Sequence, residues 1–258
     1  MTPDDLLDVL RRAAASVAAV LAATDEWGPA GTRAGQYRSD LAADAAALGV
    51  LDAAGLGVLS EESGRHHPER AVTVVVDPLD GSTNAERRLP WYATSLCAVD
   101  DDGPLAAVVV DLVVGTRFEA MRGAGATRDG MALRPSGVAR LGDAFVGISG
   151  LPAKSLGWRQ FRALGAVALD LCAVADGRLD GYVDCSTDAH GPWDYLGGLL
   201  MCREAGAAVA DADDRELVVL GHGDRRTPVA AANPALLSAL MDARRRVGSA
   251  DQVPRLRG

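Results

Sequence analysis

Two aspartates close an apolar run in the segment VVVDPLDGSTN, residues 74–84. The carboxylates of Asp77 and Asp80 and the main-chain carbonyl of Leu79 can face one point, because Pro78 stiffens the turn between them. Oxygen-only ligands of this kind suit Mg²⁺ or Mn²⁺ better than zinc, which prefers nitrogen and sulfur. A divalent cation would therefore explain why two charged groups end a strand that is otherwise apolar.

The three residues after Asp80 offer main-chain N–H groups to an anion. Gly81 can adopt conformations closed to other residues, and Ser82 and Thr83 follow it directly. If a helix begins here, its free amides and its dipole favour a phosphate beside the carboxylates. The alternative is an ordinary β-turn, because Asp, Pro and Gly are all favoured turn residues.

The segment DPLDGSTN resembles the signature of the inositol monophosphatase superfamily, which also includes fructose-1,6-bisphosphatases and the nucleotide and histidinol phosphate phosphatases. An acidic element at residues 60–63 (SEES) and a W-D-x-x-G element at residues 193–197 match that family in order and approximate spacing. The resemblance extends over residues 3–246, almost the whole chain. It implies a layered α/β fold, the five-layer α/β/α/β/α sandwich of this superfamily.

The resemblance also implies a set of metal ligands. Glu61, Asp77 and the carbonyl of Leu79 would hold a first Mg²⁺. Asp77, Asp80 and Asp194 would hold a second, and a weaker third ion could lie near Glu61. Mn²⁺ remains an alternative metal. In a two-metal site of this type, one ion lowers the pKa of the attacking water while both brace the phosphoryl oxygens.

By the same resemblance, Glu61 and Ser82 would position and activate the attacking water, and Asp40 would support the third ion or its waters. Gly81, Ser82 and Thr83 would bind the phosphate, next to Asp80 and Asp194. The reaction would be in-line hydrolysis without a phospho-enzyme. Asp194 has an alternative role as a helix cap, which is compatible with binding a metal.

The residues expected to contact the alcohol part of the substrate, which we call the alcohol side of the site, depart from the family pattern. Residues 165–168 read GAVA where the family has G-[ST]-A-A, so a hydroxyl is missing and valine replaces a small residue. Asp184 aligns with an acid that contacts substrate hydroxyls, although inositol phosphatases carry Glu there. The stretch between Asp184 and Asp194 is about three residues longer than in the family, and the additional residues lie within CSTDAHG. His190 lies in that stretch; it could reach the substrate, but exposure in a loop is the expectation.

Helices and strands alternate along the rest of the chain. Thr2 and Pro3 predict the start of a first helix, and Ser39 could cap a second, so that the two form a hairpin. Further helices are predicted at residues 163–175, 194–205 and 234–246. Strands are predicted within residues 57–63, 72–80, 93–122, 180–184, 209–211, 217–220 and 228–232, with residues 123–130 as a turn-rich connection. Two lobes are expected: residues 1–145, with the hairpin and the DPLDGST motif, and residues 146–258, which contribute Asp194 and substrate contacts.

Composition limits the binding partners and the cellular location that can be expected for the protein. A net charge of −9 and a pI near 4.9 argue against nucleic-acid and membrane-surface binding, because both need a basic face. The acidic N-terminus does not resemble a signal peptide, no apolar stretch is long enough to span a membrane, and four cysteines without a C-x-x-C pair favour reduced thiols. From composition we therefore expect a cytoplasmic protein; the resemblance implies an enzyme that acts on a small phosphorylated substrate, and a homodimer.

The expected activity is that of a Mg²⁺-dependent phosphomonoesterase acting on a small phosphorylated polyol, with inositol monophosphate as the first choice. Histidinol phosphate, fructose 1,6-bisphosphate and 3′-phosphoadenosine 5′-phosphate remain open as substrates. A non-catalytic relative that binds metal or a phosphorylated ligand is a second class of hypothesis, motivated by the altered GAVA segment. The sequence does not identify the alcohol, the oligomeric state or the sensitivity to lithium.

Overall fold

Helix α1 (Pro3–Ala22) begins with a reciprocal cap. The Thr2 hydroxyl accepts a hydrogen bond from the Asp5 N–H (3.2 Å), and the Asp5 carboxylate accepts one from the Thr2 N–H (3.0 Å). Helix α2 (Arg38–Ala53) packs against α1 as the predicted hairpin. The computed structural model describes residues 1–25, 27–31 and 36–247, so residues 248–258 of the predicted C-terminal lobe lie outside the described residues.

Within the described residues, the strands form two sheets. The larger has eight strands in the order β2-β1-β3-β4-β5-β6-β7-β8. Their bounds are β1 (Gly57–Ser60), β2 (Gly64–His66), β3 (Thr73–Asp80), β4 (Ala93–Asp100), β5 (Gly103–Asp111), β6 (Arg117–Met121), β7 (Gly125–Arg128) and β8 (Met131–Ala132). Strands β1 and β3 pair in parallel, whereas the other neighbours are antiparallel.

The smaller sheet has five strands in the order β10-β9-β11-β13-β12. These are β9 (Phe145–Ser149), β10 (Gln160–Arg162), β11 (Gly181–Asp184), β12 (Ala208–Asp211) and β13 (Pro228–Ala231). The remaining helices are α3 (Ser82–Glu86), α4 (Val167–Ala175), α5 (Pro192–Ala205) and α6 (Pro234–Val247), with a 3₁₀ turn η1 (Leu141–Asp143).

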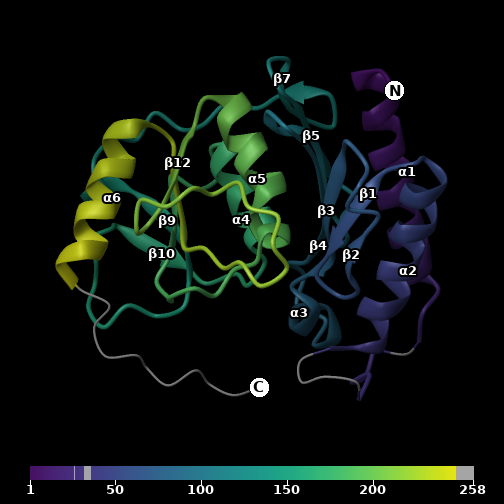
Figure 1. Ribbon diagram of the computed structural model, residues 1–258. Helices are drawn as coiled ribbons and strands as arrows, with labels where there is room; N and C mark the ends of the chain where they lie inside the picture. The colour runs from purple at the N-terminus through teal and green to yellow at the C-terminus, as the bar shows by residue number, and fades with distance from the viewer. Residues whose placement is uncertain (26, 32–35, 248–258) are drawn as a thin grey trace.

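Five layers follow one another across the molecule: α1 with α2, the larger sheet, α4 with α5, the smaller sheet, and α6 (Figure 1). The predicted α/β/α/β/α sandwich is therefore confirmed. No helix of the described residues is both long and apolar enough to cross a membrane.

Every residue of strand β3 is buried, because helices cover both faces of the larger sheet. Val74 and Val76 pack in the cluster that includes α1 and α2 side chains, whereas Val75 packs in the cluster that includes α4 and α5 side chains. Because side chains alternate along a strand, Asp77 continues the Val75 side, toward the α4 and α5 layer.

Several element boundaries differ from the sequence predictions. The cap of α2 is Tyr37, not Ser39. Helix α4 begins at Val167 instead of residue 163, because Gly165 has a positive φ (89°) and Ala166 is extended. The expected connection over residues 123–130 contains β7, which pairs with β6. Residues 217–220 do not form a strand; instead Leu217 is buried, and its carbonyl accepts a hydrogen bond from the Tyr195 hydroxyl (2.7 Å).

Candidate metal and phosphate site

The parallel pairing of β1 with β3 brings Glu61 beside Asp77. The register matches Ser60 with Val76, and the Glu61 N–H donates to the Val76 carbonyl (3.1 Å), one residue beyond the end of β1. The next residue of each strand is therefore an acid at the same edge of the sheet. Leu59, like Val75, packs toward α4 and α5, so strand alternation directs both acids to that layer.

The turn that carries Glu61 is held by side chains from other layers. The Ser60 hydroxyl donates to Asp44 on α2 and accepts the Glu62 N–H (3.0 Å). On the other side, the His222 Nε2 lies 3.1 Å from the Glu61 carbonyl oxygen. The main chain at Glu61 is thus tied both to α2 and to the loop that precedes β13.

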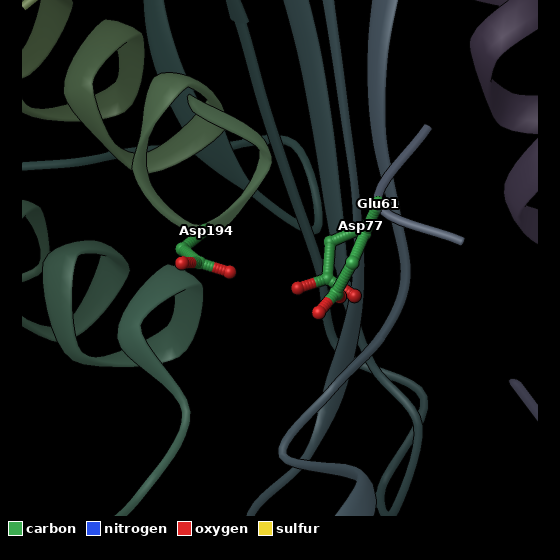
Figure 2. Close-up of side chains that lie close together, drawn as sticks. All are labelled: Glu61, Asp77 and Asp194. Carbon is green, nitrogen blue, oxygen red and sulfur yellow. The ribbon is translucent and has the colours of Figure 1, made fainter. Parts of the chain in front are cut away.

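Asp194 reaches the same point from the start of α5. It is the third residue of that helix, and its Oδ2 accepts the N–H of Gly191, the residue before the helix (2.8 Å). Glu61, Asp77 and Asp194 each offer a carboxylate oxygen, and these oxygens all lie within 4.8 Å of one another. Figure 2 shows the Glu61 and Asp77 carboxylates side by side, with one oxygen of Asp194 directed toward them.

Burial makes this cluster costly without a counter-charge. It raises the pKa of Asp77 well above its usual range, and the negative charges of Glu61, Asp80 and Asp194 raise it further. Among the described residues, no arginine or lysine forms an ion pair with Asp77 or Asp80. Oxygen donors in this arrangement fit a hard divalent cation such as Mg²⁺ or Mn²⁺.

Asp80, at the other end of the D-P-L-D turn, is not part of the acidic group formed by Glu61, Asp77 and Asp194, so its predicted role as a metal ligand stays a prediction. Its Oδ2 accepts the N–H of Ala168 in the first turn of α4 (2.7 Å), so this carboxylate caps a helix that has no hydroxyl of its own at the N-terminus. Burial and then the charge of Asp194 raise the pKa of Asp80 to about 8. The turn itself is tightened by the Leu79 N–H, which donates to Asp77 Oδ1 (3.0 Å).

Gly81 is required at the next position for two reasons. Its φ is +86°, and an added Cβ would lie 3.0 Å from the Trp91 carbonyl oxygen and 3.2 Å from the Ala166 Cβ. Ser82 and Thr83 then open the short helix α3. The predicted helix start after Asp80 is therefore present, while the binding of phosphate by these amides stays a prediction.

Asp40 lies in a neighbouring segment and is not part of the acidic group formed by Glu61, Asp77 and Asp194. Its carboxylate accepts the N–H of Tyr37 (2.9 Å) at the start of α2. The Tyr37 hydroxyl is 3.5 Å from the Thr83 hydroxyl, so this segment borders the predicted phosphate side. A role for Asp40 in a third ion site stays a prediction.

Asp184 ends β11 and is fully buried. Its Oδ1 accepts hydrogen bonds from the Ser186 N–H (2.8 Å) and hydroxyl, whereas its Oδ2 is buried without a hydrogen-bond partner among the described residues. A buried acceptor of this kind is unusual in a folded protein and is available for a ligand donor such as a hydroxyl.

The expectation that His190 is exposed is wrong. Its side chain is only 12% exposed and lies between Asp184 and Asp194. Burial alone would lower the pKa of His190, but the contact with Asp194 and the charges of Asp184 and Asp194 outweigh it and raise the pKa to about 9. The available sequence signal was its place four residues before Asp194, a spacing that brings side chains together at a helix start.

Comparison with known proteins agrees with this architecture. The model of the inositol monophosphatase family matches residues 52–249. The protein named "Nus factor SuhB" of Salmonella typhimurium strain 14028s is 35% identical over 201 residues, which cover 71% of this chain and 72% of that protein. The "Fructose-1,6-bisphosphatase/inositol-1-monophosphatase" of Thermococcus kodakarensis is 34% identical over 195 residues, covering 73% of this chain and 75% of that one.

Among solved structures, the extragenic suppressor protein suhB from Bartonella henselae superposes with a TM-score of 0.80 at 27% identity. The match covers 94% of this chain and 99% of that one. The sequence motifs, the five layers and these matches lead to one conclusion: the chain belongs to the inositol monophosphatase family.

Proposed function

We propose that this protein is a divalent-cation-dependent phosphomonoesterase that acts on a small phosphorylated polyol, with inositol monophosphate as the first substrate to test. The observation that carries this proposal is the convergence of Glu61, Asp77 and Asp194 within 4.8 Å, from two layers of the fold. Asp77 is buried and forms no ion pair with an arginine or lysine among the described residues, and a buried charge of this kind is destabilising unless a ligand compensates it. The family membership supports the same chemistry.

Glu61, Asp77 and the Leu79 carbonyl would hold one Mg²⁺, and Asp77, Asp80 and Asp194 would hold another, with Mn²⁺ as a substitute. When bound, such ions neutralise the phosphoryl oxygens and make water a better nucleophile. Glu61 would then accept the proton of the attacking water at a carboxylate oxygen, with the Ser82 hydroxyl holding that water in line. The amides of residues 81–83 would bind the phosphate.

On the alcohol side, Asp80 and Asp184 would accept hydrogen bonds from substrate hydroxyls. Asp184 Oδ2 supports this role because it is buried and accepts no hydrogen bond among the described residues, while the His190 Nε2 lies 3.5 Å from it. Acceptors suit a polyol better than a second phosphate, which would need basic groups. The name of the Thermococcus kodakarensis relative nevertheless keeps fructose 1,6-bisphosphate as an alternative, and histidinol phosphate and 3′-phosphoadenosine 5′-phosphate belong in the same comparison.

A second candidate is a member of the family that binds a metal or a phosphorylated ligand without turnover. The segment at residues 165–168, which lacks the family hydroxyl, supports it, and so does a relative that is named as a Nus factor. This candidate leaves open whether nucleic acid or a protein is a partner. A cytoplasmic homodimer is the proposed setting for either function.

The decisive experiment is phosphate release from a panel of phosphomonoesters, with and without Mg²⁺. The panel holds inositol 1-phosphate, histidinol phosphate, fructose 1,6-bisphosphate and 3′-phosphoadenosine 5′-phosphate. We expect Mg²⁺-dependent turnover of the inositol ester, lowered at least about 100-fold in Asp77→Asn, because a charge that binds both ions is removed. Asp52→Asn, which changes an exposed acid on α2, is the matched control. No turnover of any ester by the wild type would favour the non-catalytic candidate.

A further inference from the structure

His190 is held in place by the main chain on both sides. It precedes α5, and it forms an isolated β-bridge with Arg226, in which the Arg226 N–H donates to the His190 carbonyl (2.8 Å). Gly191 follows and leads directly into the helix at Pro192. The imidazole is therefore fixed between the loop after β11 and the loop before β13, and the side chain is nearly buried.

The Nδ1 of His190 lies 3.3 Å from the Oδ2 of Asp194. The same oxygen accepts the Gly191 N–H at 2.8 Å, so both contacts fall on one side of the carboxylate. No hydrogen bond to Oδ1 of Asp194 is found among the described residues. The protein thus holds Oδ2 by two contacts and leaves Oδ1 without a hydrogen bond among the described residues, which makes Oδ1 available to a cation. Figure 2 shows one oxygen of Asp194 directed toward Glu61 and Asp77.

The Nε2 of the same ring faces the alcohol side. It lies 3.4 Å from the Tyr182 hydroxyl and 3.5 Å from the Oδ2 of Asp184. A single side chain therefore contacts the acid predicted to bind metal and the acid predicted to bind substrate hydroxyls. Groups that hydrogen-bond to a metal-binding carboxylate fix its orientation, and their loss commonly weakens metal affinity about 10–100-fold.

We infer that His190 is a positioning residue: its Nδ1–H holds Asp194 in the orientation that binds a divalent cation, while its Nε2 faces Asp184 at ion-pair distance (3.5 Å). This inference rests on the proposed function for the presence of the cation. It goes beyond the metal ligands themselves, because His190 contacts neither Glu61 nor Asp77 within the described hydrogen bonds and ion pairs.

Three substitutions separate the two nitrogens. His190→Asn keeps an N–H donor near the Nδ1 position, His190→Gln keeps one near the Nε2 position, and His190→Leu keeps neither. His66→Leu is the matched control, since His66 lies on β2 and contacts Ser63 instead of the acidic cluster. Binding of Mn²⁺ alone, followed by the electron paramagnetic resonance signal of the free ion, measures affinity without any turnover.

We expect His190→Leu and His190→Gln to bind Mn²⁺ about 10–100-fold more weakly than the wild type, and His190→Asn to remain within a few-fold of it. Thermal unfolding without metal checks that each variant is folded. The assignment would be overturned by any of three results: the same Mn²⁺ affinity in all three variants, a His190→Asn variant that binds as weakly as His190→Leu, or a His190→Leu variant that binds Mn²⁺ more tightly than the wild type. A wild type that hydrolyses no ester, while His190→Leu still loses Mn²⁺ affinity, would reject the proposed function and leave the positioning role standing.

Discussion

At the scale of single residues, the loop that carries His190 is anchored by Asp211 at the end of β12. Arg215 donates to both oxygens of Asp211 (2.8 and 3.0 Å) and also contacts Asp188, two residues before His190 (2.6 Å). Burial alone would raise the pKa of Asp211, but the hydrogen bonds from Arg215 and from the Thr227 and Asp213 amides outweigh it and lower the pKa. The ionised carboxylate is therefore the form that stabilises the fold.

This network predicts a pH-dependent effect of Asp211→Asn on stability. A lowered folded-state pKa stabilises the protein above the unfolded value of 3.8, and that contribution is lost as the pH falls through the folded value. We expect the variant to lose about 1–3 kcal/mol of unfolding free energy at pH 7, with a smaller difference from the wild type below about pH 4. Urea unfolding at several pH values measures it. The control is Asp213→Asn, which changes an exposed acid 3.5 Å from Arg215 and should have little effect on the free energy of unfolding. If Asp211→Asn lowered the free energy of unfolding equally at every pH, the prediction would be wrong.

The sequence predicted that acidic side chains converge at the site, but it did not predict which other side chains are buried beside them. The family resemblance implied that Glu61, Asp77, Asp80 and Asp194 converge, and the structure brings the carboxylate oxygens of Glu61, Asp77 and Asp194 within 4.8 Å of one another. The burial of His190 could not be predicted in this way. It depends on how the additional residues after Asp184 fold back to pair with Arg226, far along the chain, and no local pattern encodes that pairing.

At the scale of elements, the position of α5 depends on its close approach to α4. A Cβ added at Gly198 would lie 2.4 Å from the Cβ of Leu171, and one added at Gly197 would lie 2.7 Å from the Ser95 hydroxyl oxygen. Both distances are far below van der Waals contact. Two consecutive glycines therefore let α5 sit between α4 and β4, with Asp194 at its start.

We expect Gly198→Ala to push α5 away from α4, destabilise the protein by about 1–3 kcal/mol and weaken cation binding, because Asp194 would move with the helix. Gly49→Ala in α2 is a control at a site where nothing lies within 4 Å, and it should be neutral or stabilising by up to about 1 kcal/mol. Urea unfolding and Mn²⁺ titration test both variants. Wild-type stability in Gly198→Ala would show that the helices can separate freely.

The elements that sequence patterns missed are those fixed by tertiary pairing. Strand β10 lies just before the helix predicted at residues 163–175, in residues for which no element was predicted, and Gln160 and Arg162 pair with β9. In the other direction, residues 217–220 have strand composition and no ladder, since Leu217 packs on α5 instead. Apolar strands and amphipathic helices were predictable from periodicity, whereas short edge strands were not.

At the scale of the whole molecule, the site lies where two layers meet. Asp77 lies on β3 of the larger sheet and Glu61 directly follows β1, whereas Asp194 lies on α5. Figure 1 shows α5 in the layer next to the larger sheet. Each layer has its own apolar packing, but the carboxylates face one another across the boundary with like charge. Without a cation their repulsion opposes the contact between the layers. A bound cation would instead be attracted to carboxylates of both layers and so hold the two layers together.

Metal binding should therefore stabilise the fold as a whole. Since a cation held by both layers binds the folded chain and not the unfolded one, Mg²⁺ at 100 times its dissociation constant should add about 2.7 kcal/mol to the free energy of unfolding. For a chain of this size that corresponds to a rise in melting temperature of about 5–10 °C, reversed by EDTA. Calorimetry at constant ionic strength, with Na⁺ as the control, measures it. Asp77→Asn should melt at the same temperature with and without Mg²⁺, because the acid shared by both proposed ions has lost its charge. An equal rise in that variant would mean that Mg²⁺ stabilises the protein elsewhere, and the acids between the two layers would then need another explanation.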